Sequence, residues 1–274
     1  MSDPFRDRVA VVTGGASGLG LAMARAMGDR GARLVLADID ESALAEAERS
    51  FRDAGVRVRV QRTDVTDRAS VDALADATFS HFGGAHILCN NAGIAALGSV
   101  HDADPQVWEK SMAVNLWGVV HGVDAFLQRM IDQNQGGHVV NTASMAGLVG
   151  MKYLGVYCVT KFAVVGLSES LERELRPHGI GVHVLCPMIV ATNIGANSAR
   201  VLGQAPPPED TGAIPGDAAP PPGAIKGGVI TPEEVGRRVV EGIERGRLFI
   251  LTHPEQREFL KRRWERQDAV FEDF

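Results

Sequence analysis

A glycine-rich loop between an apolar strand and a helix is the feature that most restricts how this chain can fold. Residues 8–12 form a short apolar run rich in β-branched side chains, typical of a buried strand. The loop from Thr13 to Gly20 reads T-G-G-A-S-G-L-G, and helix formers continue to Met27. Glycines let a backbone approach a pyrophosphate, and the helix N-terminus supplies free N–H groups. The pattern predicts a dinucleotide site; the alternative is a turn that only packs the helix on the strand.

Strand-like and helical runs continue to alternate along the chain. This alternation predicts an α/β fold, namely a single-domain Rossmann-type doubly wound parallel sheet of about seven strands, flanked by helices, over residues 1–274. Ligands bind such a sheet beyond the carboxyl ends of its strands. The strands are expected at about 8–13, 33–38, 57–61, 86–89, 138–143, 181–186 and 248–251.

A carboxylate ends the second predicted strand. Asp38 lies about twenty residues beyond the glycines, where an acid holds the adenosine ribose hydroxyls and repels a 2′-phosphate. Neither Ser17 nor Ile39 supplies a cation for such a phosphate. The pattern therefore favours NAD over NADP. The alternative is that Asp38 only caps the next helix, a role that Asp40 could fill instead.

Tyr157 and Lys161 are four residues apart on a predicted helix, so their side chains share one face. A nearby ammonium favours the phenolate, and we expect the pKa of Tyr157 to fall below its usual value of about 10. A phenol tuned in this way can exchange a proton with an alcohol or a carbonyl. The pair alone is common on solvated helices, but beside a nucleotide-binding pattern it indicates redox chemistry.

Composition excludes several other classes of function. The net charge of −6 argues against a general affinity for nucleic acid or for an anionic membrane surface. No apolar run approaches the roughly 18 residues of a membrane span, and the first seven residues do not resemble a signal peptide. Cys89, Cys158 and Cys186 form no C-x-x-C pair. They predict reduced thiols in a cytoplasmic protein with no metal site.

In their order and spacing, these motifs resemble the classical short-chain dehydrogenase/reductase (SDR) family over nearly the whole chain. The matching elements are T-G-x-x-x-G-x-G at 13–20, Asp64-Val65, Asn90-Asn91-Ala92-Gly93, Asn115, Ser144, Tyr157 with Lys161, and residues 187–192.

The resemblance implies a catalytic set of Asn115, Ser144, Tyr157 and Lys161. Tyr157 would be the general base in oxidation and the acid in reduction, and Lys161 would lower its pKa and hold the nicotinamide ribose. Ser144 would hydrogen-bond the substrate oxygen, and Asn115 would anchor a water that links Lys161 to solvent. The alternatives are a turn cap for Ser144 and, for Asn115, a buried amide bonded to backbone.

The resemblance also implies cofactor contacts. Asp64 and Val65 would flank the adenine, Asn90 would pair with backbone and ribose, and Val190 and Thr192 would meet the nicotinamide carboxamide. The full expected set is Gly14, Ser17, Gly18, Leu19, Gly20, Asp38, Asp64, Val65, Asn90, Tyr157, Lys161, Pro187, Val190 and Thr192.

The residues expected to face the substrate are mostly apolar, which favours a bulky neutral alcohol or ketone. They include Met145, Leu148, Met151 and Met188. Met188 stands where the family usually has glycine, and it either narrows the pocket or changes the turn. Residues 249–253 faintly resemble bacterial members that oxidise lignin-derived aryl-ether alcohols. The Pro- and Gly-rich segment 193–230 is expected to be a substrate lid or a surface insertion.

Two other functions stay open at this point. One is an NADP-dependent carbonyl reductase of the same family, and the other is a nucleotide-sensing protein without catalysis on this fold. The resemblance further implies a homodimer or homotetramer.

Overall fold

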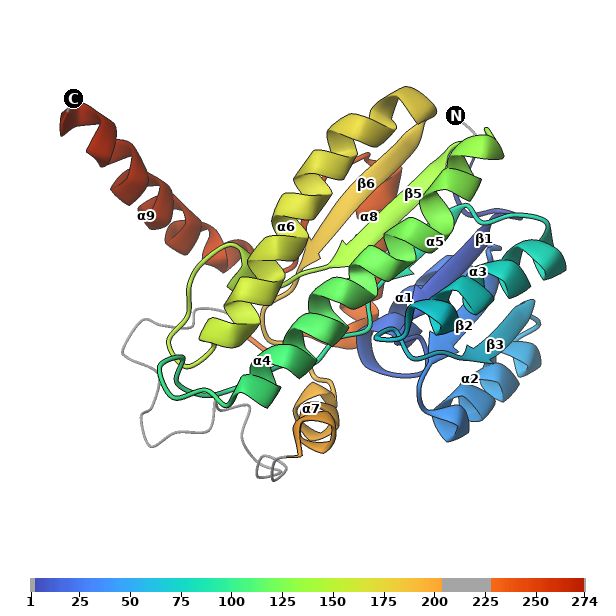
Figure 1. The fold of residues 1–274 in the computed structure, drawn as a ribbon. Coiled ribbons are helices and arrows are strands. Elements are labelled where there is room, and N and C mark those ends of the chain that lie inside the picture. The colour runs from blue at the N-terminus through green and yellow to red at the C-terminus, as the bar shows by residue number, and fades with distance from the viewer. Residues whose placement is uncertain (1–2, 204–227, 274) are drawn as a thin grey trace.

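One parallel sheet organises the molecule. The computed structural model describes residues 3–203 and 228–273, and in these the strands follow the order β3-β2-β1-β4-β5-β6-β7 (Figure 1). Each neighbouring pair is parallel. The predicted fold class is therefore confirmed. The strands are β1 (Val9–Thr13), β2 (Arg33–Asp38), β3 (Val58–Arg62), β4 (Ile87–Asn90), β5 (Gly137–Thr142), β6 (Ile180–Cys186) and β7 (Phe249–Leu251).

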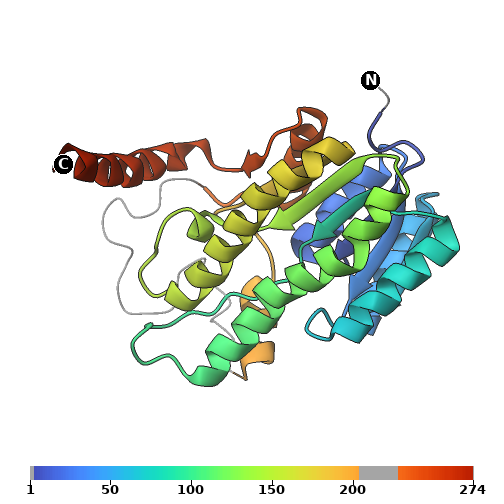
Figure 2. The same cartoon turned by 45° about the horizontal axis from the view of Figure 1, so that its top comes forward.

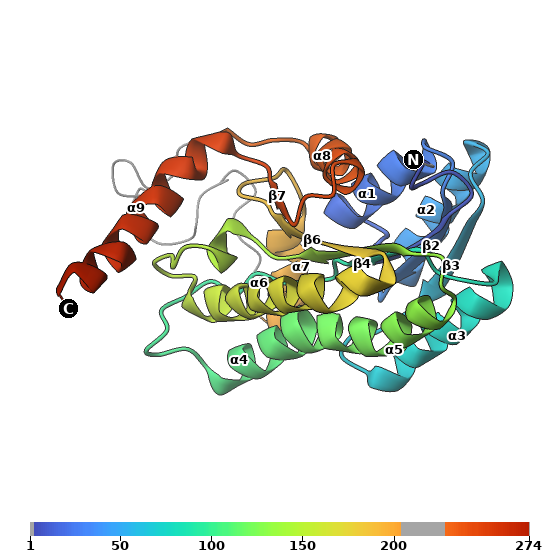
Figure 3. The same cartoon turned by 90° about the horizontal axis from the view of Figure 1, so that it is seen from above.

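Helices cover both faces of the sheet (Figure 3). On one face lie α1 (Gly18–Gly28), α2 (Glu41–Asp53) and α8 (Pro232–Glu244). On the other lie α3 (Arg68–Phe82), α5 (Gly118–Asp132) and α6 (Gly155–Leu175), with α4 (Pro105–Met112) leading into α5. Because both faces are covered, the central strand β1 is apolar up to its last residue and buried throughout, whereas the edge strand β3, with the sequence V-R-V-Q-R, alternates.

Strand β1 shows how the two layers divide the core. Ala10 and Val12 pack with Met23 of α1, whereas Val9 and Val11 belong to the cluster on the opposite face. Successive strand residues point to opposite faces, so one apolar strand serves both layers. Its last residue is followed by the glycine-rich loop, which is thereby placed at the carboxyl edge of the sheet.

The helical segment that begins after Asp104 is interrupted. Asp104 caps α4 by accepting a hydrogen bond from the N–H of Gln106 at 2.8 Å. A π-helical turn, Ala113–Trp117, then separates α4 from α5 and contains Asn115. Such turns are rare and often occur at functional sites. The turn gives the Asn115 side chain a register that a continuous α-helix would not.

The segment 193–230 divides into described and undescribed parts. Its beginning forms α7 (Ile194–Leu202), and its central Pro-Gly part, 205–223, lies outside the described residues. Ile230 pairs with Val190 and leads into the cap of α8, where Thr231 accepts a hydrogen bond from the N–H of Glu234 at 3.3 Å. This is the cap that T-P-E-E predicts.

The C-terminal helix α9 (Arg257–Asp268) extends past α6 and away from the body (Figures 1 and 2). It contains no buried residue, and Trp264 is 63% exposed. Over the described parts of the chain, the structure has no helix with the length and apolar character needed to cross a bilayer.

Candidate active site

The carboxyl ends of the strands open into one cavity of about 1480 Å³. This exceeds the range of about 300–1,000 Å³ that is typical of a small-molecule site, so the cavity has room for more than one small molecule. Of the residues expected in the site, the cavity is lined by Gly14, Ser17, Gly18, Leu19, Asp38, Asp64, Val65, Ser144, Met145, Met151, Tyr157, Lys161, Pro187, Met188, Val190 and Thr192.

The glycine loop has the backbone geometry that a phosphate cradle requires. Gly18 has a φ of +51°, a left-handed conformation that favours glycine. Gly20 does not line the cavity; a Cβ there would lie 2.0 Å from the carbonyl oxygen of Gly14, so its glycine permits close packing of α1 on the loop. Ser17 is the N-cap of α1 without a side-chain cap bond. The loop therefore fits a pyrophosphate at a helix N-terminus.

Asp38 and Asp40 divide the roles that the sequence left open. The Asp40 carboxylate caps α2 by accepting from the N–H groups of Ser42 and Ala43, both at 3.1 Å. Asp38 instead lines the cavity, where its carboxylate accepts from the N–H of Ala16 at 3.2 Å. This carboxylate is consequently held beside the glycine loop with access to the cavity.

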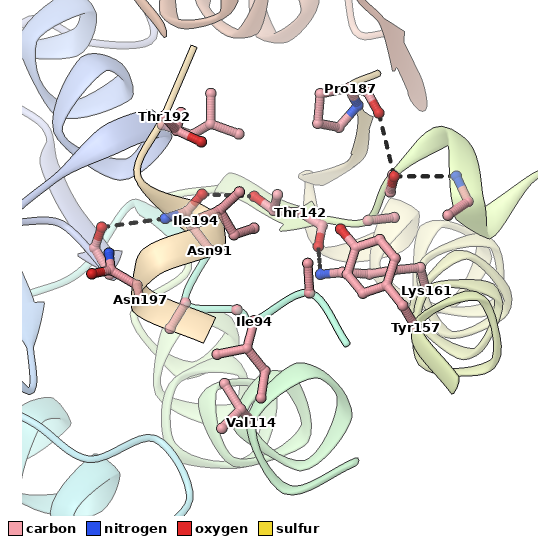
Figure 4. A pocket seen from close by; sticks show the side chains of 18 of the residues that line it. Asn91, Ile94, Val114, Thr142, Tyr157, Lys161, Pro187, Thr192, Ile194 and Asn197 are labelled. Carbon is pink, nitrogen blue, oxygen red and sulfur yellow. Dashed lines mark hydrogen bonds between the residues drawn. The ribbon is translucent and has the colours of Figure 1, made fainter. Parts of the chain in front are cut away.

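Tyr157 and Lys161 lie on one face of α6 and line the cavity (Figure 4). The Lys161 side chain is 3% exposed, and its Nζ donates a hydrogen bond to the carbonyl oxygen of Thr142 at 2.8 Å. Its Nζ lies 5.6 Å from the centroid of the Tyr157 ring. The ammonium is thus hydrogen-bonded to a backbone carbonyl and lies over the ring of the tyrosine.

The expected fall in the pKa of Tyr157 does not occur in this structure. Burial raises the pKa of Tyr157 to about 12, and hydrogen bonding with Ser144 only partly opposes this. Burial also lowers the pKa of Lys161 to about 8. Both groups are removed from water, which disfavours each charged form, and the spacing of residues in the sequence does not reveal this removal.

Ser144 combines the two roles considered for it. Its hydroxyl accepts a hydrogen bond from the N–H of Ala146 at 3.1 Å and thereby caps the 3₁₀ turn Met145–Gly147. The same hydroxyl donates to the carbonyl oxygen of Pro187 at 3.4 Å. Ser144 lines the cavity beside Tyr157, so capping and a place at the site are compatible.

Asn115 does not line the cavity and matches the alternative of a buried amide bonded to backbone. Its Oδ1 accepts from the N–H of Ile94 at 2.8 Å, and its Nδ2 donates to the carbonyl oxygen of Ile94 at 2.8 Å. A Cβ on Gly93 would lie 3.2 Å from this Oδ1 and 3.5 Å from the Nζ of Lys161. The amide of Asn115 therefore lies near the Lys161 ammonium, and its Oδ1 and Nδ2 are hydrogen-bonded to the backbone of Ile94.

Asn90 and Leu148 are placed differently from the expectation. Asn90 is buried away from the cavity, where its Nδ2 donates to Oδ1 of Asn141 at 2.9 Å. Its neighbour Asn91 lines the cavity instead, because successive side chains at the end of a strand point to opposite faces. Leu148 packs against the apolar cluster that contains Val164.

Several residues that line the cavity were not expected there. Gln256 and Phe259 come from the C-terminal segment, whose composition, rich in Arg and Glu, gives no sign of a place in the site. Lys110 of α4 and Arg200 of α7 also line it. The Arg200 guanidinium is 3.9 Å from Oδ2 of Asp40. Periodicity gives no signal for such residues, because they reach the site through tertiary packing.

Comparison with known proteins identifies the family. The profile of the short chain dehydrogenases matches residues 8–201. The chain belongs to the short-chain dehydrogenase family. As a member it is an oxidoreductase on a Rossmann-type fold, which confirms the resemblance seen in the sequence.

Individual relatives of this short-chain dehydrogenase span most of its length. A short-chain dehydrogenase/reductase from Burkholderia phymatum, crystallised with NAD, shares 39% identity with a TM-score of 0.86, covering 97% of this chain and 96% of that one. A C alpha-dehydrogenase of Sphingobium is 31% identical over 95% of this chain and 85% of the relative. A 2-(S)-hydroxypropyl-CoM dehydrogenase of Xanthobacter autotrophicus is 34% identical over 76% and 81%, respectively.

Proposed function

We propose that the protein is an NAD-dependent dehydrogenase that interconverts a secondary alcohol and a ketone. The observation that carries this proposal is the convergence of Ser144, Tyr157 and Lys161 on the cavity that also contains the glycine loop and Asp38. A phenol, a hydroxyl and an ammonium can position an alcohol oxygen and move its proton. The similarity to a relative crystallised with NAD supports the choice of cofactor.

The residues of the cavity fit NAD along its length. The glycine loop and the first turn of α1 would hold the pyrophosphate, and the Asp38 carboxylate would accept hydrogen bonds from the adenosine ribose. Val190 and Thr192 would contact the nicotinamide end, with Lys161 at its ribose. When bound, NAD supplies the hydride chemistry; the protein's part is to position the substrate and move its proton.

Tyr157 is the residue that would donate or accept the proton of the reaction. A phenol with a pKa of about 12 is protonated at neutral pH, so Tyr157 is set to donate to a carbonyl oxygen in the direction of reduction. In the direction of oxidation Tyr157 must first lose that proton, which its high pKa makes unfavourable. A positive charge near the phenol oxygen would lower this pKa. Ser144 would donate a hydrogen bond to the oxygen where negative charge develops.

We propose a bulky substrate, apolar or aryl, such as a lignin-derived aryl-ether alcohol. The substrate half of the cavity contains three thioethers, Met145, Met151 and Met188, and the ring of Phe259. Thioethers are polarisable and pack well against aromatic rings. The relative named a C alpha-dehydrogenase supports dehydrogenation as the reaction class, and the substrate class rests on the lining of the cavity.

Replacing Tyr157 by Phe tests the reaction. The variant Tyr157→Phe should bind NADH with nearly unchanged affinity, while kcat for aryl and alicyclic secondary alcohols falls by at least about 100-fold, because proton transfer is worth that much. The measurements are NADH fluorescence titration and the absorbance change during turnover. Retained turnover would refute the proton role.

An NADP-dependent carbonyl reductase is the second candidate, and one observation favours it. Arg200 places a guanidinium at the cavity near Asp40, at the end where a 2′-phosphate would lie. The Asp38 carboxylate opposes this because it repels that phosphate. The ratio of kcat/KM for NAD and NADP decides between them, and a clear preference for NADP would overturn the choice of NAD.

We also propose that the protein is a cytoplasmic homodimer or homotetramer. Besides copies of itself, it would bind only small molecules. The exposed Trp264 and Phe271 at the C-terminal end support self-association, and the three free, buried cysteines suit a reducing compartment. Light scattering coupled to size-exclusion chromatography measures the assembly, and a monomeric mass at micromolar concentration would contradict it.

A further inference from the structure

A chain of hydrogen bonds joins the glycine loop to the catalytic lysine (Figure 4). The Nδ2 of Asn91 donates to the carbonyl oxygens of Thr13 and Gly14, at 3.0 and 3.3 Å. The Oδ1 of Asn91 accepts from the hydroxyl of Thr142 at 3.1 Å. The carbonyl oxygen of Thr142 in turn accepts from the Nζ of Lys161 at 2.8 Å. One amide therefore stands between the cofactor loop and α6.

The surroundings leave the amide of Asn91 little freedom to rotate. Its backbone N–H donates to Oγ1 of Thr13 at 2.9 Å. A Cβ on Gly20 would lie only 2.7 Å from Nδ2, so α1 confines the side chain from a further direction. Both ends of the amide are used, one as donor and the other as acceptor. An aspartate could keep only the acceptor half, and an alanine neither.

The position of Lys161 depends on the carbonyl of Thr142. The lysine is buried, and this carbonyl is the hydrogen-bond acceptor that the structure gives its ammonium. A buried charge is sensitive to the orientation of such a dipole, because little water is present to replace it. The hydroxyl of Thr142 donates to Oδ1 of Asn91, so the residue that carries this carbonyl is also held through its side chain.

We propose that Asn91 is a positioning residue that holds the glycine-rich loop and Lys161 in one register, acting on the lysine through Thr142. The role rests on the proposed function, because it assigns Lys161 to the reaction. It predicts that the two halves of the amide can be separated by mutation. Loss of the donor half affects cofactor binding, and loss of the Thr142 hydroxyl affects the lysine.

Four variants separate these effects. Thr142→Val keeps the size of the side chain and removes the hydroxyl, and Thr142→Ser keeps the hydroxyl. Asn91→Asp removes the donor half. Thr78→Val is the matched control, since Thr78 is a buried threonine of α3 that does not line the cavity and whose hydroxyl donates to the carbonyl oxygen of Leu74. Thr142→Ala also lacks the hydroxyl and replaces the valine variant if that one does not fold.

Three readouts are compared, namely the Kd for NADH, kcat, and the pKa of Lys161. The pKa is measured by NMR of isotope-labelled lysine, which is practical because the chain has five lysines. Thr142→Val should lower kcat about tenfold and the pKa of Lys161 by about half a unit or more, the worth of one hydrogen bond. Its Kd for NADH should change less than about twofold, and Thr142→Ser should resemble the wild type.

Asn91→Asp should raise the Kd for NADH about tenfold, because a carboxylate faces the loop carbonyls that the amide had satisfied. Wild-type values of kcat and of the Lys161 pKa in Thr142→Val would overturn the proposal. Equal damage in Thr142→Ser, or wild-type NADH affinity in Asn91→Asp, would also overturn it. If the wild type oxidises no alcohol, the proposed function fails, while the NMR and NADH measurements still decide the role of Asn91.

Discussion

At the residue scale, Lys161 places function and stability in opposition. Its pKa is about 8 in the folded protein against 10.5 for a free lysine, so the unfolded chain binds more protons between these values. Stability therefore rises with pH through this window, and below it the buried charge costs about 3 kcal/mol. Part of that energy is returned by the hydrogen bond to Thr142.

Replacing this lysine should stabilise the inactive enzyme. The variant Lys161→Met removes the buried charge and nearly keeps the volume, so at pH 7 its free energy of unfolding should exceed that of the wild type by about 1–2 kcal/mol. The variant should have no measurable dehydrogenase activity. Urea unfolding at pH 7 and pH 9 measures the gain, which should shrink at the higher pH; a destabilised variant would contradict this reasoning.

The place of Tyr157, Lys161 and Asp38 on the cavity wall could be predicted from the sequence, but the electrostatics of the tyrosine could not. Tyr157 and Lys161 follow from a spacing of four on a helix, and Asp38 follows from its distance to the glycines. The pKa of Tyr157 depends instead on how much water the fold removes from it, which spacing does not report. Asn91 escaped prediction because its partners, at the ends of β1 and β5, are far apart in the chain.

At the element scale, most strands were predictable because they are short apolar runs that precede a turn, and β3 because its apolar and polar residues alternate. The π-helical turn at Ala113–Trp117 was not, since its residues carry no sequence signal that separates them from an ordinary helix. The place of Phe259 on the cavity wall was also hidden, because it depends on where the start of α9 packs.

The packing of α8 on α1 gives a prediction at this scale. A Cβ on Gly236 would lie 2.6 Å from the backbone carbonyl oxygen of Ala22, so Gly236→Ala must push the two helices apart. We expect a loss of about 1–3 kcal/mol in the free energy of unfolding, as for other overpacked cores. NADH affinity should also weaken, because α1 carries the loop at its N-terminus.

The matched control for Gly236 is Gly166 of α6, where an added Cβ meets nothing within 4 Å. Gly166→Ala should leave stability unchanged or raise it by up to about 1 kcal/mol through helix propensity. Thermal melts and NADH titrations of both variants make the comparison. Equal effects at the two positions would mean that close approach of α8 to α1 does not decide the outcome.

At the scale of the whole molecule, the two edges of the sheet have different chemistry. The carboxyl edge carries the cavity, whereas His86 and His138 lie at the starts of β4 and β5, with His183 in the middle of the neighbouring strand β6. Nδ1 of His138 and Nε2 of His183 are 3.1 Å apart and share a hydrogen bond. Only one of these two nitrogens can donate, so the pair is satisfied when at least one ring is neutral.

This histidine pair should make the fold sensitive to acid. Burial, and then the charges of His183 and Arg8, lower the pKa of His138 to about 4, against 6.5 for a free histidine. The unfolded chain therefore binds more protons between these values, and stability is lost as the pH falls from 6.5 towards 4. For His138 alone the loss reaches about 2 kcal/mol by pH 5, mostly before carboxylates titrate.

The variant His138→Gln tests this account, because its amide keeps a polar group beside His183 without a proton to gain. The free energy of unfolding, measured in urea at pH 7.5 and pH 5, should fall by about 2 kcal/mol less in this variant than in the wild type. His178→Gln, which changes an exposed histidine beyond the end of α6, should keep the wild-type pH dependence. If the two variants lose stability equally, the acid sensitivity does not originate in the His138–His183 pair, and carboxylates elsewhere must cause it.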